Sequence, residues 1–198
     1  ERALYDLTYK VPHRFKVISV GKLQGESREQ DYAVTHWVTA VPVAVAGFNY
    51  GNYTRVELAD EITGYKIPGY YLSELPDNLR SYGALQSLAP GGMTKYALEQ
   101  TRAELQLCTH YFGKSPYDEI YITEQPDFAF GQSWPNLVYL PISAYTDSTQ
   151  RRMLFGTNNN KFSGFVQEMT PHEVSHQWWG HAGRVGVVPR PVAFGRVR

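Results

Sequence analysis

The sequence changes from strand-type to helix-type patterning close to residues 90–92, and this change constrains the fold more than any other feature. Before it, residues 14–20 and 32–48 alternate or run apolar and are rich in the residues that favour extended chain, and residues 55–72 are typical of a hairpin. After it, apolar residues recur at helical spacing over residues 95–112. Strands followed by helices predict an α+β chain, with an all-β piece first and an α+β piece after it.

The second half of the sequence predicts two helices and two short strands. Thr94 can cap the first helix and Gly113 can end it. The apolar face of this helix would comprise Leu98, Thr101, Leu105, Cys108 and Phe112. Residues 119–123 and 137–140 are typical of short buried strands, with a loop over 124–136 between them. A last helix is expected from about residue 161, with an apolar face of Phe162, Phe165, Val166 and Met169.

Composition excludes several classes of protein. With 198 residues and 42% hydrophobic content, the chain is long and apolar enough to bury a core. Nineteen basic and nineteen acidic residues cancel, so no net field would recruit nucleic acid or an anionic membrane, and neither is an expected partner. No apolar run approaches the length of a membrane span. The single Cys108 excludes an internal disulfide.

The strongest chemical signal is "HEVSH" at residues 172–176. Residues four apart stand on one face of a helix, so the imidazoles of His172 and His176 can reach a single Zn²⁺. Glu173 is next to the first histidine and can act as a general base. A zinc ion so held lowers the pKa of a bound water and polarises a scissile carbonyl. The pattern therefore predicts a zinc hydrolase site.

An ordinary helix start is the alternative explanation of the same residues. Thr170 could be an N-cap, with Pro171 at the first helical position and Glu173 completing a capping box. The histidines would then be surface or core residues. Chance alone produces this histidine and glutamate pattern about 0.01 times in a chain of this composition, which favours the zinc interpretation.

The segment "HEVSHQWWGH" resembles the zinc helix of the aminopeptidase N type of gluzincin metallopeptidases, and it is most like the bacterial branch of that family. The resemblance extends through "PVAVAGFNYG", "GYYLSELPDNLR" and "LQLCTHYFGKSPYDEIYITEQPDFAFGQSWPNLVYLPISAY", so it covers most of the chain. It implies that residues 1–51 end an N-terminal β-sandwich and that residues 52–182 begin a thermolysin-like catalytic domain. It also implies zinc held by His172 and His176, Glu173 as the base, and peptides as the substrate.

The stretch Gly131, Gln132, Ser133 and Trp134 departs from the family pattern at the substrate loop. The exopeptidases of the family carry a G-x-M-E-N loop whose Glu holds the free α-amine of the substrate, and Trp134 stands where that carboxylate would be. An aromatic face binds a cation more weakly than a carboxylate does, and packing is the other role open to Trp134. These four residues are candidate substrate-binding residues. Aminopeptidase, endopeptidase and ester hydrolase all remain open.

The third zinc ligand of the family is missing from its expected place. In the family it is a Glu nineteen positions after the second histidine, and Gly195 occupies that position here. The shorter spacing of the metzincin family would need a histidine at position 182, and Ala182 occupies that position here. On a continuing helix His181 would face away from the metal. We therefore expect the zinc site of this chain to be incomplete.

Residues 183–198 have the composition that GC-rich DNA produces when it is read out of frame. If the codons after Ala182 are read one nucleotide downstream, they can encode "VGWGSYRDQWLSEGFA". This text resembles the family sequence that follows the zinc helix, and it places a Glu at position 195. We predict an irregular, out-of-frame tail on a truncated zinc metallopeptidase with little or no activity. A genuine basic tail is the alternative, and a non-catalytic binding or scaffolding relative that lost the metal is the rival function.

Overall fold

The computed structural model of the chain describes residues 1–74, 94–127, 130–145, 149, 152 and 160–181, and within residues 160–167 it describes the backbone alone. The described chain is a mixed α+β structure, so the predicted fold class is confirmed. The tail predicted over residues 183–198 lies outside the described residues, as do the side chains of Phe162, Phe165 and Val166. None of the helices in the described ranges is long and apolar enough to cross a membrane.

Two small antiparallel sheets form the N-terminal part of the chain. The first has three strands in the order β1-β4-β3, and the second pairs β2 with β5. Their bounds are β1 Asp6–Pro12, β2 Lys16–Ser19, β3 Lys22–Glu29, β4 Tyr32–Val38 and β5 Phe48–Gly51. Sequence patterning predicts neither β1 nor β3. Strand β3 escapes it because nearly all of its side chains are exposed, which leaves no apolar alternation to detect.

A five-stranded mixed sheet forms the centre of the molecule, with strand order β6-β7-β8-β10-β9. The bounds are β6 Tyr53–Ala59, β7 Lys66–Leu72, β8 Tyr121–Gln125, β9 Gln132–Trp134 and β10 Leu137–Pro141. The three central strands are parallel, and the edge strands β6 and β9 are antiparallel to their neighbours. The expected hairpin over residues 55–72 is confirmed as β6 and β7.

The loop predicted over residues 124–136 is wrong at its C-terminal end, where β9 forms an edge strand. Trp134 pairs with Leu137 across a tight turn, and Asn136 in that turn has a φ of 53°. Asn tolerates this left-handed conformation better than most residues, so the chain reverses and β9 pairs back on β10. Three residues are too short a strand to show a period of two.

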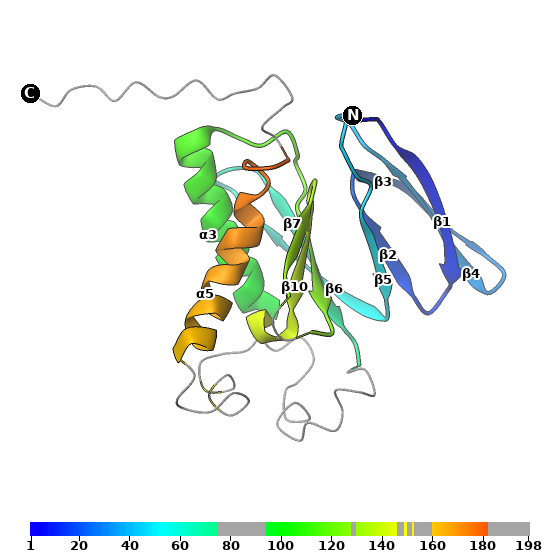
Figure 1. Ribbon diagram of the computed structural model, residues 1–198. Coiled ribbons are helices and arrows are strands. Elements are labelled where there is room, and N and C mark those ends of the chain that lie inside the picture. Colours follow the sequence, from blue (N-terminus) through cyan, green and yellow to red (C-terminus); the bar gives the residue numbers. More distant parts are fainter. Residues whose placement is uncertain (75–93, 128–129, 146–148, 150–151, 153–159, 182–198) are drawn as a thin grey trace, which may run out of the picture.

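Two helices, α3 (Thr94–Phe112) and α5 (Asn160–Ser175), cover one face of the central sheet, and the two N-terminal sheets lie on the other side (Figure 1). A 3-10 helix, η1 (Ile142–Tyr145), follows β10. The end of α3 is confirmed at Gly113, whose φ is 79° and whose N–H bonds to the carbonyl of Thr109 at 2.9 Å. Glycine is favoured here because the left-handed conformation costs it nothing.

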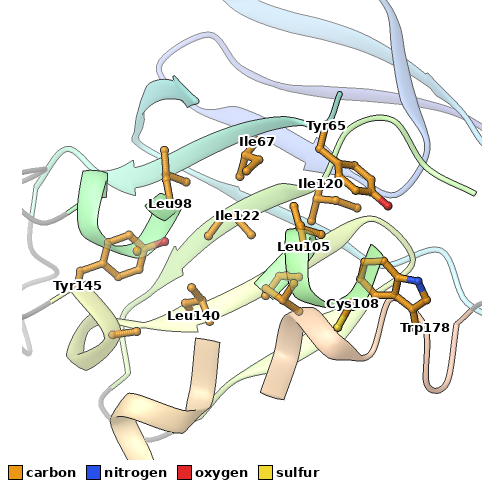
Figure 2. Packing of buried hydrophobic residues seen from close by; sticks show 14 residues of the cluster. Tyr65, Ile67, Leu98, Leu105, Cys108, Ile120, Ile122, Leu140, Tyr145 and Trp178 are labelled. Atoms are coloured by element: carbon orange, nitrogen blue, oxygen red, sulfur yellow. The ribbon is translucent and has the colours of Figure 1, made fainter. Parts of the chain in front are cut away.

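The helix-side core packs the central sheet against α3 and α5. Figure 2 shows this cluster, with side chains from β7, β8 and β10 meeting those of the two helices. Its members are Tyr65, Ile67, Ala97, Leu98, Leu105, Cys108, Ile120, Ile122, Val138, Leu140, Ala144, Tyr145, Val174 and Trp178. Each large aliphatic side chain buried in this way stabilises the fold by about 1.5–3 kcal/mol. The predicted apolar face of α3 is thus largely confirmed.

A second core lies on the opposite face of the sheet and joins it to the N-terminal strands. Its buried members are Ile18, Val20, Trp37, Tyr53, Tyr70, Tyr121 and Leu137. Successive residues of a strand point to opposite faces, so β8 sends Tyr121 into this core and Ile122 into the helix-side core. Residues 1–51 and the central sheet therefore share one continuous apolar contact, which holds the sheet and its edge strand β9 in place.

Candidate metal centre

Helix α5 passes without a break through the residues that could have been a helix start. It begins at Asn160 and ends at Ser175, with Pro171 inside it. The alternative in which Thr170 caps a new helix is therefore wrong, since Thr170 is a buried residue within the helix. Proline removes one hydrogen bond from a helix interior, yet the tertiary packing of Met169 and Val174 keeps the helix in place.

The two histidines converge on a common point at the C-terminal end of α5. The Nε2 atoms of His172 and His176 are 3.3 Å apart, and the ring centroids are separated by 4.8 Å with an interplanar angle of 87°. Two imidazole nitrogens at about 2.0–2.1 Å from a tetrahedral Zn²⁺ lie about 3.3–3.4 Å from each other. The spacing between the two Nε2 atoms thus matches one edge of a zinc tetrahedron.

The backbone holds His176 in the orientation that a metal ligand requires. Its Nδ1 lies 2.9 Å from the carbonyl oxygen of Trp179. A carbonyl oxygen can accept a hydrogen bond but cannot donate one. Nδ1 must therefore carry the proton, and the lone pair remains on Nε2, the atom that faces His172. This arrangement fixes both the tautomer and the plane of the ring.

Glu173 lies beside the two histidines and is 8% exposed. Its carboxylate packs on Gly131, where an added Cβ would lie 2.8 Å from Oε1 and 2.9 Å from Cγ. Burial raises the pKa of Glu173, and the neighbouring His172 and His176 offset part of that rise. A carboxylate with a raised pKa takes up a proton more readily, which suits a general base.

A third metal ligand does not join this pair within the part of the chain that the structure describes. No group of three or more His, Cys, Asp or Glu side chains there could hold a metal ion. The prediction for His181 assumes that the helix continues through it, and this assumption is wrong because the helix ends at Ser175. Gly180 turns the chain with a φ of 119°. The ring of His181 lies 6.4 Å from that of His176, and burial lowers the pKa of His181 to about 4. Position 195 lies outside the described residues.

The predicted substrate stretch lies next to the histidine pair but divides between two faces of the sheet. Gly131 touches Glu173, and Ser133 is buried facing the end of α5. Trp134, the next residue along β9, points to the opposite face and belongs to the second core. Its ring packs on Gly47, where an added Cβ would lie 2.6 Å from Cγ of Trp134. Gln132 is half-buried at the start of β9.

Sequence patterning did not single out two polar residues beside this site. Gln177 is 0% exposed and hydrogen-bonds to the β9–β10 hairpin, and Asn136 occupies the turn of that hairpin. The residue pair Pro135 and Asn136 is a turn signal that could have located the hairpin. Nothing in the sequence marks Gln177, because its role depends on strands that lie about 40 positions earlier.

Another buried carboxyl, Glu124, lies outside the histidine pair and its surroundings. It follows Ile122 on the helix side of β8, is 9% exposed, and accepts a hydrogen bond from the N–H of Leu72 at 2.7 Å. Burial raises its pKa to about 7, and the bond from Leu72 offsets part of the rise. Glu124 is therefore expected to change charge near neutral pH, and within the described part of the chain no hydrogen bond or ion pair joins it to His172 or His176.

The fold of the chain resembles part of the fold of solved M1 zinc metallopeptidases. An M1 zinc metallopeptidase from Deinococcus radiodurans matches with a TM-score of 0.61 and 17% identity over 91% of this chain and 35% of that chain. A Glu-to-Ala mutant from the same organism matches with a TM-score of 0.62 and the same identity and coverage. A two-domain M1 zinc metallopeptidase mutant bound to L-arginine matches with a TM-score of 0.60, again at 17% identity and the same coverage.

These matches concern structure alone. No protein-family model matches the sequence, and no curated protein matches it. The chain spans about 35% of the length of the solved structures to which it is similar.

Proposed function

We propose that the histidine pair and Glu173 form the zinc-binding half of a peptide-hydrolysing site. The observation that carries this proposal is the 3.3 Å separation of the His172 and His176 Nε2 atoms, with the buried Glu173 carboxylate beside them. The likeness in fold to M1 zinc metallopeptidases supports it. In this proposal zinc is the cofactor and peptides are the substrate class.

Each residue has a separate part in this chemistry. When bound, zinc would acidify a water and polarise the substrate carbonyl. His172 and His176 would hold the ion through Nε2, with the Trp179 carbonyl keeping the ring of His176 oriented. Glu173 would accept a proton and later pass it to the leaving nitrogen. The absence of a side chain at Gly131 leaves the Glu173 carboxylate in its place.

The position of β9 supports a peptide as substrate. This strand is at the edge of the central sheet, and it begins one residue after Gly131, which touches Glu173. An extended peptide can add to a sheet edge through main-chain hydrogen bonds, which are independent of its sequence. A peptide bond held along β9 would therefore lie close to the general base.

We further propose that this 198-residue chain binds zinc weakly and hydrolyses peptides slowly or not at all. Gly195 stands where the family resemblance predicts the third ligand, and a site with two imidazoles lacks the anionic ligand that tightens binding. The proposal that residues 183–198 are read out of frame accounts for this loss. The rival is a non-catalytic binding protein, and the same missing carboxylate favours it.

One experiment separates these possibilities. The chain as printed and a version with the reading frame restored from codon 183 would be purified, and bound zinc and peptide turnover would be measured for each. We expect little zinc in the printed chain, and stoichiometric zinc with peptide hydrolysis in the restored chain. His172→Ala in the restored chain is the control and should abolish both. A restored chain that binds no zinc would favour the non-catalytic relative.

Trp134 bears on the type of peptidase. Its ring is packed in the second core, so no carboxylate from this position of β9 reaches the metal side. We propose that the active parent does not depend on a free α-amine in the way that G-x-M-E-N aminopeptidases do. Rates for N-acetylated and free-amine peptides on the restored chain would differ little, whereas a strong preference for the free amine would contradict this proposal.

A further inference from the structure

Gln177 is the residue directly after the second histidine, and its side chain is 0% exposed. Its Oε1 accepts a hydrogen bond from the N–H of Asn136 at 2.8 Å. Its Nε2 donates to Ser133 Oγ at 2.8 Å and to the Trp134 carbonyl oxygen at 3.0 Å. One amide therefore satisfies a backbone donor, a backbone acceptor and a hydroxyl of the β9–β10 hairpin.

The hairpin that receives Gln177 is itself fixed to the N-terminal strands. The Asn136 side chain bonds to both backbone groups of Gly21. The N–H of Gly21 donates to Asn136 Oδ1 at 2.8 Å, and Asn136 Nδ2 donates to the carbonyl oxygen of Gly21 at 2.7 Å. Gly21 has a φ of 91°, and an added Cβ would lie 2.5 Å from the carbonyl oxygen of Val38. The end of α5 is thus tied to a rigid frame through Gln177 and Asn136.

His176 depends on this tie because it lies beyond the regular part of α5. The helix ends at Ser175, and the next residues continue in turns, with Gln177 N–H bonded to the Val174 carbonyl at 3.0 Å. Helical hydrogen bonds alone therefore do not set the orientation of the His176 ring. Functional groups have to be held within about 0.5 Å of the working geometry, and buried hydrogen bonds from neighbouring residues are the usual means.

We propose that Gln177 is a positioning residue for the second histidine. It anchors the turn that carries His176 to the edge strand β9, and it thereby sets the 3.3 Å distance between the two Nε2 atoms. The same anchor keeps β9, with Gly131 just before it, at a fixed distance from Glu173. This inference rests on the proposed zinc site and adds a residue that touches neither metal nor substrate.

An amide is the side chain that fits these partners. The Asn136 N–H requires an acceptor, and the Trp134 carbonyl requires a donor. Leucine would leave both unpaired in a buried site, which is costly. A glutamate would accept from Asn136 but would place a second acceptor against the Trp134 carbonyl. Gln177→Leu and Gln177→Glu therefore remove the anchor in two different ways.

The test measures zinc affinity by competition with a chromophoric chelator, using zinc alone as the probe. It uses the full chain and, in parallel, the chain whose reading frame is restored from codon 183. We expect Gln177→Leu to weaken zinc binding about 10- to 100-fold, the usual effect of losing an outer hydrogen bond around a metal site. Thr101→Val is the matched control, because Thr101 is also 0% exposed and bonds through its hydroxyl to the Ala97 carbonyl on α3. Its zinc affinity should equal that of the original chain.

The outcomes distinguish this inference from the proposed function. A folded Gln177→Leu chain with unchanged zinc affinity would overturn the positioning role alone. If neither the original chain nor the chain with the restored reading frame binds zinc, the proposed zinc site fails, and the positioning role fails with it. Circular dichroism shows whether each variant is folded. Should Gln177→Leu not fold, Gln177→Glu decides: an affinity loss of about threefold or more supports the role, and an unchanged affinity refutes it.

Discussion

Replacing Glu124 by glutamine should make the chain more stable at pH 8, and it should remove the fall in stability that the titration of Glu124 causes between pH 5 and 8. Glutamine has nearly the same shape, and its Oε1 can still accept the hydrogen bond that Leu72 donates at 2.7 Å. The substitution removes only the ability of the side chain to become charged. A buried carboxyl that must ionise loses hydration, and this loss is the cost that the substitution avoids.

The size of the effect follows from the pKa. Burial raises the pKa of Glu124 from its ordinary value of 4.5 to about 7. Between these values the folded chain holds a proton that the unfolded chain has released, so the free energy of unfolding falls as the pH rises. The stabilising proton is fully present below pH 4.5, and its contribution is lost as the pH passes through about 7. The full loss corresponds to about 3 kcal/mol.

The assay is urea denaturation at pH 5, 6, 7 and 8, with the free energy of unfolding obtained at each pH. The original chain should lose about 2.5 kcal/mol more than Glu124→Gln across this range, because part of the full loss falls below pH 5. Glu61→Gln, which changes an exposed carboxyl in the β6–β7 turn, is the control and should keep the original slope. An equal slope for Glu124→Gln and the original chain would refute the assignment of this titration to Glu124.

Three further substitutions test the candidate site. Gly131→Ala would place a Cβ 2.8 Å from Glu173 Oε1, so it should destabilise the chain by about 1–3 kcal/mol in denaturation, whereas Gln132→Ala should have a smaller effect. His172→Ala should abolish the thermal stabilisation that added zinc confers, as seen by differential scanning fluorimetry with and without a chelator. Trp134→Ala should lower the free energy of unfolding by about 2–4 kcal/mol without changing zinc affinity, because its ring packs on Gly47 and not on the histidines. A zinc affinity lowered by Trp134→Ala would contradict that separation.

The sequence predicted the elements whose patterns are local. The helix predicted over residues 95–112, with Thr94 as its cap, has both a periodic apolar face and a terminating glycine. It appears as α3 from Thr94 to Phe112, with Gly113 in the left-handed conformation, but the predicted cap is wrong because the buried hydroxyl of Thr94 makes no hydrogen bond within the described part of the chain. The hairpin of β6 and β7 and the strands β8 and β10 also have apolar patterns that depend only on their own residues. Local propensity and burial agree in these segments, so the prediction succeeds.

Elements that show no apolar period of their own, or that run against a local signal, were missed. Strand β3 has almost no buried side chain and forms because β4 offers a backbone edge. Strand β9 has three residues and forms because Asn136 reverses the chain onto β10. Helix α5 continues through Pro171, although a local argument would start a helix there, because buried neighbours outweigh one lost hydrogen bond.

In the candidate site, too, one part could be predicted from local spacing and the rest could not. The spacing of the two histidines was enough to predict that they face each other, since four residues make about one helical turn. The contacts that surround them were not predictable. Gly131 meets Glu173 and Gln177 meets Ser133 across more than 40 positions, and such pairs depend on how the sheet packs against α5.

The close packing between the N-terminal strands and β9 limits what could take the place of residues 1–51. Gly47 accommodates the ring of Trp134. Gly21 donates a hydrogen bond from its N–H to Asn136 Oδ1 and accepts one at its carbonyl oxygen from Asn136 Nδ2. An unrelated β-module in place of residues 1–51 would need glycines at the positions of Gly21 and Gly47. Without them a Cβ would collide with the Val38 carbonyl or the ring of Trp134, and the second core could not pack. In this chain the histidine-bearing part and the N-terminal strands therefore depend on each other, and a larger side chain at Gly47 would require a smaller one at Trp134.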